Sequence, residues 1–183
     1  MASFLYIIRV TKRREAVSTM ELGYAAYQSP IGTIRVIADT VGIKRVELFE
    51  EDWENFLNDH PDLQEDQILC GEAIRQLDEY FNGKRKDFDL PLSIEGTEFR
   101  MQVWKALQSI PYGEVKSYAD IAEMIGNPKA VRAVGQANRS NQIPIIIPCH
   151  RVIGKSGSLG GYAGTNTPIK KMLLELEGFT VPQ

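Results

Sequence analysis

The segment IPCHRVIG at positions 147–154 places a thiol, an imidazole and a guanidinium next to one another. A thiol attacks as its thiolate, and holding a thiol with an ordinary pKa near 8.5 in that form at pH 7 costs about 2 kcal/mol. A neighbouring imidazole can take the thiol proton, and a carboxylate can hold the second ring nitrogen. Cys149 and His150 are therefore candidates for a nucleophile and its base.

A carboxylate for such a relay is available near the end of the chain. The acidic residues that follow Glu123 are Glu175 and Glu177, at the end of the last predicted helix. Adjacent side chains on an extended chain point in opposite directions, so contact between Cys149 and His150 requires a bend or a bridging water. A lone cysteine in an apolar run is also typical of an inert core residue, and these residues alone leave both interpretations open.

The composition excludes several classes of protein. The 183 residues are 43% hydrophobic and 25% charged, as in an ordinary globular protein. Two cysteines exclude a disulfide framework and are typical of a reducing, intracellular setting, and with two histidines they are too few to predict a metal site. The apolar run in MASFLYIIRV is too short to cross a membrane and lacks the layout of a signal peptide. Because Met20 opens a more ordinary N-terminus, residues 1–19 are interpreted as an N-terminal extension or a misassigned start.

Charge is distributed unevenly along the chain. The net charge is −3, yet no acidic residue lies between Glu123 and Glu175, while the acids gather between Glu47 and Asp89. The basic residues of the acid-free stretch are Lys129, Arg132, Arg139, Arg151, Lys155, Lys170 and Lys171. One half of the chain can therefore present a basic face to a polyanion, although such segregation is also common in proteins that bind none.

Alternating polar and apolar residues in GYAAYQSPIGTIRVIADTVGIKRVELFEE predict three short strands, with turns at Ser29-Pro30, Gly32 and Gly42. Apolar residues at helical spacing predict a helix over 66–81, which ends at Asn82-Gly83 and holds Cys70 at the edge of its apolar stripe. KRKDFDLPLSIEG is interpreted as a return strand and linker. We place a domain boundary there, giving domains 20–95 and 96–183.

The second half of the chain is predicted to be mostly helical. Helices are expected over 98–110 and from Thr167 to Gly178. Between them, Ser117 and Asp120 form the pattern of a capping box at the start of a short helix that ends at Gly126. Asn127 and Pro128 then predict the start of another helix. Two helices joined across a glycine suggest a helix-turn-helix, but a plain helical hairpin fits this periodicity equally well.

Several motifs in order make the chain similar to a known family. PCHRV at 148–152 resembles the active-site motif of the O6-alkylguanine-DNA alkyltransferases, the methylated-DNA–protein-cysteine methyltransferases. The resemblance covers 99–178 through FRMQVWKALQSIPYGEV, SYADIA, GNPKAVRAVGQANRSNQIPIIIPCHRV, GYAG and LELEG. It implies an α+β protein. A small N-terminal domain of antiparallel sheet and helix, ribonuclease-H-like, would precede a mostly helical C-terminal domain with a helix-turn-helix.

The resemblance also implies catalytic roles for four residues. Cys149 would accept the alkyl group, and His150 would act as the base through a water molecule. Glu177, which precedes Gly178 as the family's glutamate precedes its glycine, would orient His150. Asn141 would brace the turn that leads to the cysteine.

Other residues are assigned by the same resemblance to the substrate or to DNA. Tyr118 would donate to the guanine ring, and Arg132 would enter the base stack where the damaged nucleotide has left. Tyr162 would form a wall of the pocket, and the backbone N–H of Ala163 would face the alkylated oxygen. The remaining predicted contacts are Lys129, Arg139, Arg151 and the main-chain carbonyls of Cys149 and Val152.

The implied activity is DNA repair by direct reversal, in which one alkyl group moves from O6-alkylguanine in double-stranded DNA to Cys149 without a cofactor. A base inside a duplex hides its reactive carbon, so the nucleotide must be extruded. The thioether product offers water no activated carbonyl, so each protein accepts one alkyl group and stops. We expect a monomer that contacts no membrane.

Two other functions stay open on the sequence. A sensor of alkylated DNA would bind the lesion without transfer, although relatives of that kind lack the cysteine. A cysteine hydrolase built on Cys149, His150 and Glu177 would need an oxyanion hole and repeated turnover, and it would leave the helix pair unexplained.

Overall fold

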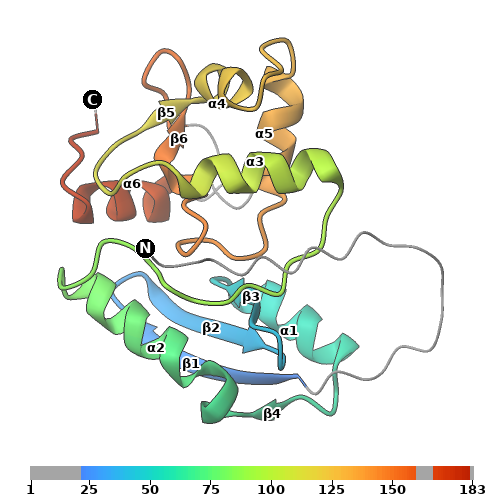
Figure 1. The fold of residues 1–183 in the computed structure, drawn as a ribbon. Coiled ribbons are helices and arrows are strands. Elements are labelled where there is room, and N and C mark those ends of the chain that lie inside the picture. The colour runs from blue at the N-terminus through green and yellow to red at the C-terminus, as the bar shows by residue number, and fades with distance from the viewer. Residues whose placement is uncertain (1–21, 160–166, 182–183) are drawn as a thin grey trace. The chain divides into compact units, whose positions relative to one another are not determined.

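The computed structural model of the protein describes residues 22–159 and 167–181 (Figure 1). The chain divides between Glu95 and Gly96 into two compact units, which are described separately. The elements of the first unit are β1 (Gly23–Ser29), β2 (Gly32–Ala38), β3 (Ile43–Glu47), α1 (Glu50–Asp59), β4 (Gln64–Glu65) and α2 (Gln67–Phe81). Those of the second are α3 (Glu98–Gln108), β5 (Lys116–Ser117), α4 (Tyr118–Met124), α5 (Val131–Arg139), η1 (Cys149–Arg151), β6 (Val152–Ile153) and α6 (Thr167–Leu176).

The first unit is a sheet with the strand order β3-β2-β1-β4, in which β1, β2 and β3 are antiparallel and β4 runs parallel to β1. The three predicted strands are confirmed. Ser29 pairs with Gly32 across the tight turn that Ser29-Pro30 predicted, and Gly32 has a φ of +111°. Such a φ favours glycine because it has no Cβ to clash, so this residue type allows the turn.

Two helices cover opposite faces of this sheet. Tyr27, on one face, contacts the Phe81 ring of α2 and donates to Asp78. Tyr24 lies an odd number of positions from Tyr27 in β1, so its side chain points to the other face, where it contacts the Trp53 ring of α1. The core therefore has three layers, helix, sheet and helix.

The sequence predicted this unit incompletely. α1 was not predicted, although Trp53, Phe56 and Leu57 have the spacing of a short apolar stripe on one helix face. The return strand predicted in KRKDFDLPLSIEG is not a strand. That segment makes an isolated bridge between Leu92 and Ile43 at the edge of the sheet, next to Pro91, which has no N–H to donate to a ladder.

The second unit packs three helices against the segment that carries the cysteine. Val103 and Leu107 of α3 and Val134 of α5 are fully buried. The indole Nε1–H of Trp104 donates to the Ala137 carbonyl at 2.9 Å, which ties α3 to α5 within the core. The predicted helices over 98–110 and 167–178 are confirmed, with slightly earlier ends.

The helix pair α4–α5 begins as predicted and continues differently. Ser117 and Asp120 form the capping box at the start of α4. Asn127 was predicted to cap the next helix, but its N–H donates to the Ala122 carbonyl and so closes α4 behind Gly126, which has a φ of +73°. The Asn127 carbonyl accepts from the Ala130 N–H in a separate turn, and α5 begins only at Val131.

Within the described part of the chain, no helix has the length and apolar character needed to cross a membrane.

The side chain of Asp66 caps α2 by accepting hydrogen bonds from the N–H groups of Ile68 and Leu69 at 2.8 and 3.0 Å. We expect Asp66→Ala to lower the free energy of unfolding by about 1 kcal/mol, because both N–H groups lose their acceptor. Ile68→Ala is the matched control, since that side chain is 96% exposed in the same turn and its loss should have little effect. Urea unfolding followed by circular dichroism measures both; equal losses would contradict the assignment of the cap.

Candidate active site

The chain bends at the cysteine. Cys149, His150 and Arg151 form one turn of 3-10 helix, η1, and all three are buried. This turn supplies the bend that adjacent side chains need if they are to serve one site. Immediately after it, β6 pairs in parallel with β5, which places Lys116 opposite Val152 just before Tyr118 begins α4.

Asn141 holds the segment that leads to this turn. Its amide nitrogen donates to the Ile147 carbonyl at 2.9 Å, and its amide oxygen accepts from the Ile143 N–H at 3.0 Å. Between these two anchors, Ile145 is fully buried with a φ of +75°. A β-branched residue in this region is strained, so the surrounding contacts must hold it there. The structure thus places Asn141 where a brace was predicted.

Glu177 lies at the centre of a buried polar cluster. Its Oε1 lies 2.7 Å from His150 Nε2, and both side chains are shielded from solvent. Arg151 donates from Nε to Oε2 at 2.9 Å and from a terminal nitrogen to Oε1 at 3.0 Å. The Gly113 N–H adds a fourth bond, to Oε2 at 3.2 Å. The prediction that Glu177 rather than Glu175 faces His150 agrees with this geometry, because Glu175 is exposed.

The charges of this cluster follow from burial and pairing. Burial lowers the pKa of His150, and the bond to Glu177 opposes that effect without cancelling it. Burial alone would raise the pKa of Glu177, but hydrogen bonds and charge from His150 and Arg151 hold it at about 2. Arg151 is a permanent cation, so Glu177 is ionised even beside a neutral imidazole. An ionised carboxylate at Nε2 requires the proton on Nε2, which leaves Nδ1 as the basic ring nitrogen.

The structure changes the role predicted for Arg151. This residue was predicted to contact substrate or DNA, yet its side chain is buried. One terminal nitrogen donates to the Ile110 carbonyl at 2.6 Å, and its guanidinium lies over the Tyr112 ring. With its donors directed at Ile110 and Glu177, Arg151 acts inside the fold rather than at a surface.

Lys170 is a buried cation that the sequence analysis did not single out as a site residue. It is fully buried in α6, and its Nζ donates to the carbonyls of Val152 and Leu159 at 2.5 and 2.6 Å. Burial lowers its pKa to about 8, and the charge of Cys149 opposes this effect. A signal was present, because Lys170 precedes Leu173, Leu174 and Glu177 at helical spacing and so shares their buried face.

Tyr118 lies near the cysteine at the start of α4. It is half-buried, and burial together with the charge of Cys149 raises the pKa of its phenol. Gly135 of α5 lies against the Tyr118 ring, since a Cβ there would be 3.9 Å from a ring carbon. The phenol therefore stays protonated at neutral pH and can donate a hydrogen bond.

Helix α5 has two contrasting faces. Arg132, Gln136 and Arg139 are exposed on the outer face, and Lys129 is exposed in the preceding turn. Asn138 is buried on the inner face, where its amide nitrogen lies 3.4 Å from the Cys149 carbonyl oxygen. One helix thus presents cations outward and contacts the cysteine segment inward.

The Val152 carbonyl was predicted to accept a hydrogen bond from the substrate. It already accepts one from Lys170, and its second lone pair can accept another. Tyr162 and Ala163, like residues 1–19, lie outside the described residues.

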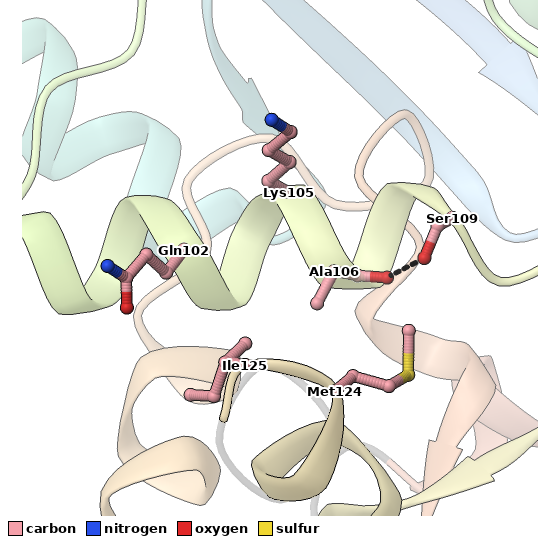
Figure 2. A pocket seen from close by; sticks show the side chains of 6 residues that line it. All are labelled: Gln102, Lys105, Ala106, Ser109, Met124 and Ile125. Atoms are coloured by element: carbon pink, nitrogen blue, oxygen red, sulfur yellow. Dashed lines mark hydrogen bonds between the residues drawn. The ribbon is translucent and has the colours of Figure 1, made fainter. Parts of the chain in front are cut away.

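A separate hollow of about 370 Å³ lies between α3 and α4 (Figure 2). It is lined by Gln102, Lys105, Ala106, Ser109, Met124 and Ile125, so it includes none of the predicted site residues. Among the described residues, no group of three or more histidine, cysteine, aspartate or glutamate side chains could hold a metal ion.

Comparisons with known proteins agree across both units. Residues 98–179 match the family model described as 6-O-methylguanine DNA methyltransferase, DNA binding domain, and residues 22–94 match that of its ribonuclease-like domain. The constitutive methylated-DNA–protein-cysteine methyltransferase of Bacillus subtilis is 49% identical over 84% of this chain and 94% of its own. A Methanosarcina acetivorans protein of the same name, without the word constitutive, is 48% identical over 85% and 97%.

Solved structures show the same similarity. The crystal structure of the Mycobacterium tuberculosis O6-methylguanine methyltransferase matches with a TM-score of 0.77 and 43% identity, covering 85% of this chain and 92% of that one. A structure of the M. tuberculosis OGT in complex with DNA matches with a TM-score of 0.75 and 42% identity over the same shares.

The buried lysine predicts a measurable dependence of stability on pH. The pKa of Lys170 is about 8 in the folded chain against 10.5 ordinarily, so the unfolded chain binds more protons between these pH values. The stability that Lys170 contributes therefore rises with pH over this range, by at most about 1.4 kcal/mol per pH unit. Lys170→Met should lose this rise, whereas Lys171→Met, at the exposed neighbouring position, should keep it. Denaturant unfolding at pH 8, 9 and 10 measures the difference; parallel curves for all three proteins would contradict it.

Proposed function

The chain belongs to the 6-O-methylguanine DNA methyltransferase family, and we propose that Cys149 is the cysteine that accepts the alkyl group. The protein repairs DNA by direct reversal, moving an alkyl group from O6-alkylguanine to itself. The observation that carries the assignment is the buried hydrogen bond between Glu177 and His150, because His150 is adjacent to Cys149 on one turn. DNA binding and alkyl acceptance are assigned to residues 96–183, and residues 20–95 to the ribonuclease-like domain.

The transfer is a displacement at the alkyl carbon. The Cys149 sulfur forms a bond to that carbon, and the bond from the carbon to O6 of guanine breaks with its electron pair leaving on the guanine. The thiol proton goes to His150, which Glu177 orients. Tyr118 donates a hydrogen bond to the guanine ring and so stabilises the charge that develops there. Lys170 contributes a nearby positive charge that favours the thiolate.

Access to the carbon requires the nucleotide to leave the duplex. Unstacking a base costs a few kcal/mol, and a side chain that fills the gap recovers part of that cost. Arg132 lies exposed near the start of α5 and is proposed for this position, with Lys129 and Arg139 proposed to contact phosphates. Because the substrate is DNA and the nucleophile is a free thiol, we propose an intracellular location.

The assignment of Cys149 is tested by mass spectrometry after incubation with a duplex that contains O6-methylguanine. The peptide with Cys149 should permanently gain one methyl group per protein. Cys149→Ser should abolish the gain and keep DNA binding, whereas Cys70→Ser should keep both, because Cys70 is buried in the other unit with a pKa raised to about 11. Binding of the duplex without modification of the protein would indicate a lesion sensor. Repeated turnover of an ester or amide substrate would indicate a hydrolase. Methylation of Cys70 would indicate a different acceptor residue.

The role of Arg132 is tested by comparing two substrates. Arg132→Ala should slow transfer from duplex DNA by about tenfold or more, because the gap in the stack is no longer filled, while transfer from the free base O6-methylguanine should hardly change. Arg100→Ala is the control, since Arg100 is an exposed arginine on α3 of the same unit. Equal losses on both substrates would remove Arg132 from the extrusion step.

A further inference from the structure

The carboxylate of Glu177 is shared between two partners. His150 Nε2 and a terminal nitrogen of Arg151 both lie within 3.0 Å of Oε1, and Arg151 Nε lies 2.9 Å from Oε2. Arg151 is held in this position from two further sides, by the Ile110 carbonyl at 2.6 Å and by the Tyr112 ring. Tyr112 in turn donates to the Leu176 carbonyl at 3.0 Å, which links the 111–113 turn to the end of α6.

The charge balance of this cluster decides the state of the imidazole. With Arg151 present, the anionic carboxylate and the guanidinium neutralise each other, and a proton on His150 would add an uncompensated buried charge. Without the guanidinium, the carboxylate would keep the Gly113 N–H and the imidazole as partners, and a buried carboxylate that lacks a cation draws a proton onto a neighbouring base. The same imidazole would then be a cation at rest rather than an acceptor for the thiol proton.

We propose that Arg151 is a positioning residue that shares the Glu177 carboxylate with His150 and thereby keeps the resting imidazole neutral and able to accept a proton. Its effect on transfer rests on the proposed function, because it acts through His150 on Cys149. Its effect on the imidazole does not, and can be measured without any substrate.

Other charged and titratable groups lie in or beside this cluster. Lys170 of α6 adds a second positive charge that opposes protonation of His150, as Arg151 does. Cys149 lies on the same turn, and Tyr112 lies beside Arg151 and Glu177. Substituting Arg151 leaves these groups in place, so its contribution can be separated from theirs.

The test is an NMR titration of the histidine side chains in the full-length protein. The chain has two histidines, so the signals of His60, in the N-terminal unit, provide an internal reference for those of His150. In the unsubstituted protein, His150 should be neutral at pH 7 with its proton on Nε2. Arg151→Gln keeps hydrogen-bond donors for Glu177 but removes the charge, and it should raise the pKa of His150 by about one pH unit or more. Arg151→Lys restores the charge and should return the pKa most of the way.

The outcomes separate this proposal from the proposed function. A charged His150 at pH 7 in the unsubstituted protein, or equal pKa values in the Gln and Lys variants, would overturn the role of Arg151 while leaving methyl transfer to Cys149 intact. Should Arg151→Gln fail to fold, the protonation state of the unsubstituted protein and the Lys variant still decide the matter. Failure of Cys149 to gain a methyl group would instead overturn the proposed function and leave the titration result standing.

Discussion

A single buried carboxylate organises the helical unit. Glu177 accepts from His150 on the cysteine turn, from Arg151 on the same turn and from the Gly113 N–H in the 111–113 turn. An ionised group shielded from water is costly unless its oxygens are bonded, and here four donors reach them. Compensation of the buried Glu177 charge therefore holds three segments together, namely the end of α6, the turn after α3 and the cysteine turn.

The approach to the cysteine shows a second constraint, which is local strain held by specific bonds. Ile145 adopts a positive φ that its branched side chain disfavours, and Asn141 bonds the backbone on either side of it. Fully buried isoleucines at 143, 145 and 147 pack the same segment into the core. A segment fixed in this way presents Cys149 in one conformation, which suits a reagent that reacts once and needs no rearrangement for turnover.

Helix α5 connects the outside of the unit to this interior. Its outer face carries Arg132 and Arg139, and its inner face brings Asn138 to the Cys149 carbonyl. The bond from Trp104 to the Ala137 carbonyl fixes the same helix to α3. The exposed cations proposed to contact DNA and the contact to the segment that carries Cys149 thus belong to one helix, which is itself fixed to the core.

Much of this could be predicted from local sequence. The alternation of β1 to β3, the capping box at Ser117 and the helix α2 are properties of short segments, and each was predicted correctly, although Cys70 is fully buried rather than at the edge of the apolar stripe. Several motifs in order, with PCHRV around Cys149 among them, identified the family, because each motif is a short run of residues that can be read from the sequence. α1 was missed although its short apolar stripe is present in the sequence, and the start of α5 was placed too early, because a separate turn closed by the bond from the Ala130 N–H to the Asn127 carbonyl precedes that helix.

The partners of buried charges were decided by tertiary structure. In the sequence, Arg151 is a basic residue in an acid-free stretch, and Lys170 is one of a pair of lysines. In the fold, the first is bonded to a carboxylate 26 positions away and the second to a carbonyl 18 positions away. Composition and spacing thus determine which residue types can react, but packing decides which charges are removed from water, and removal from water sets both their partners and their protonation.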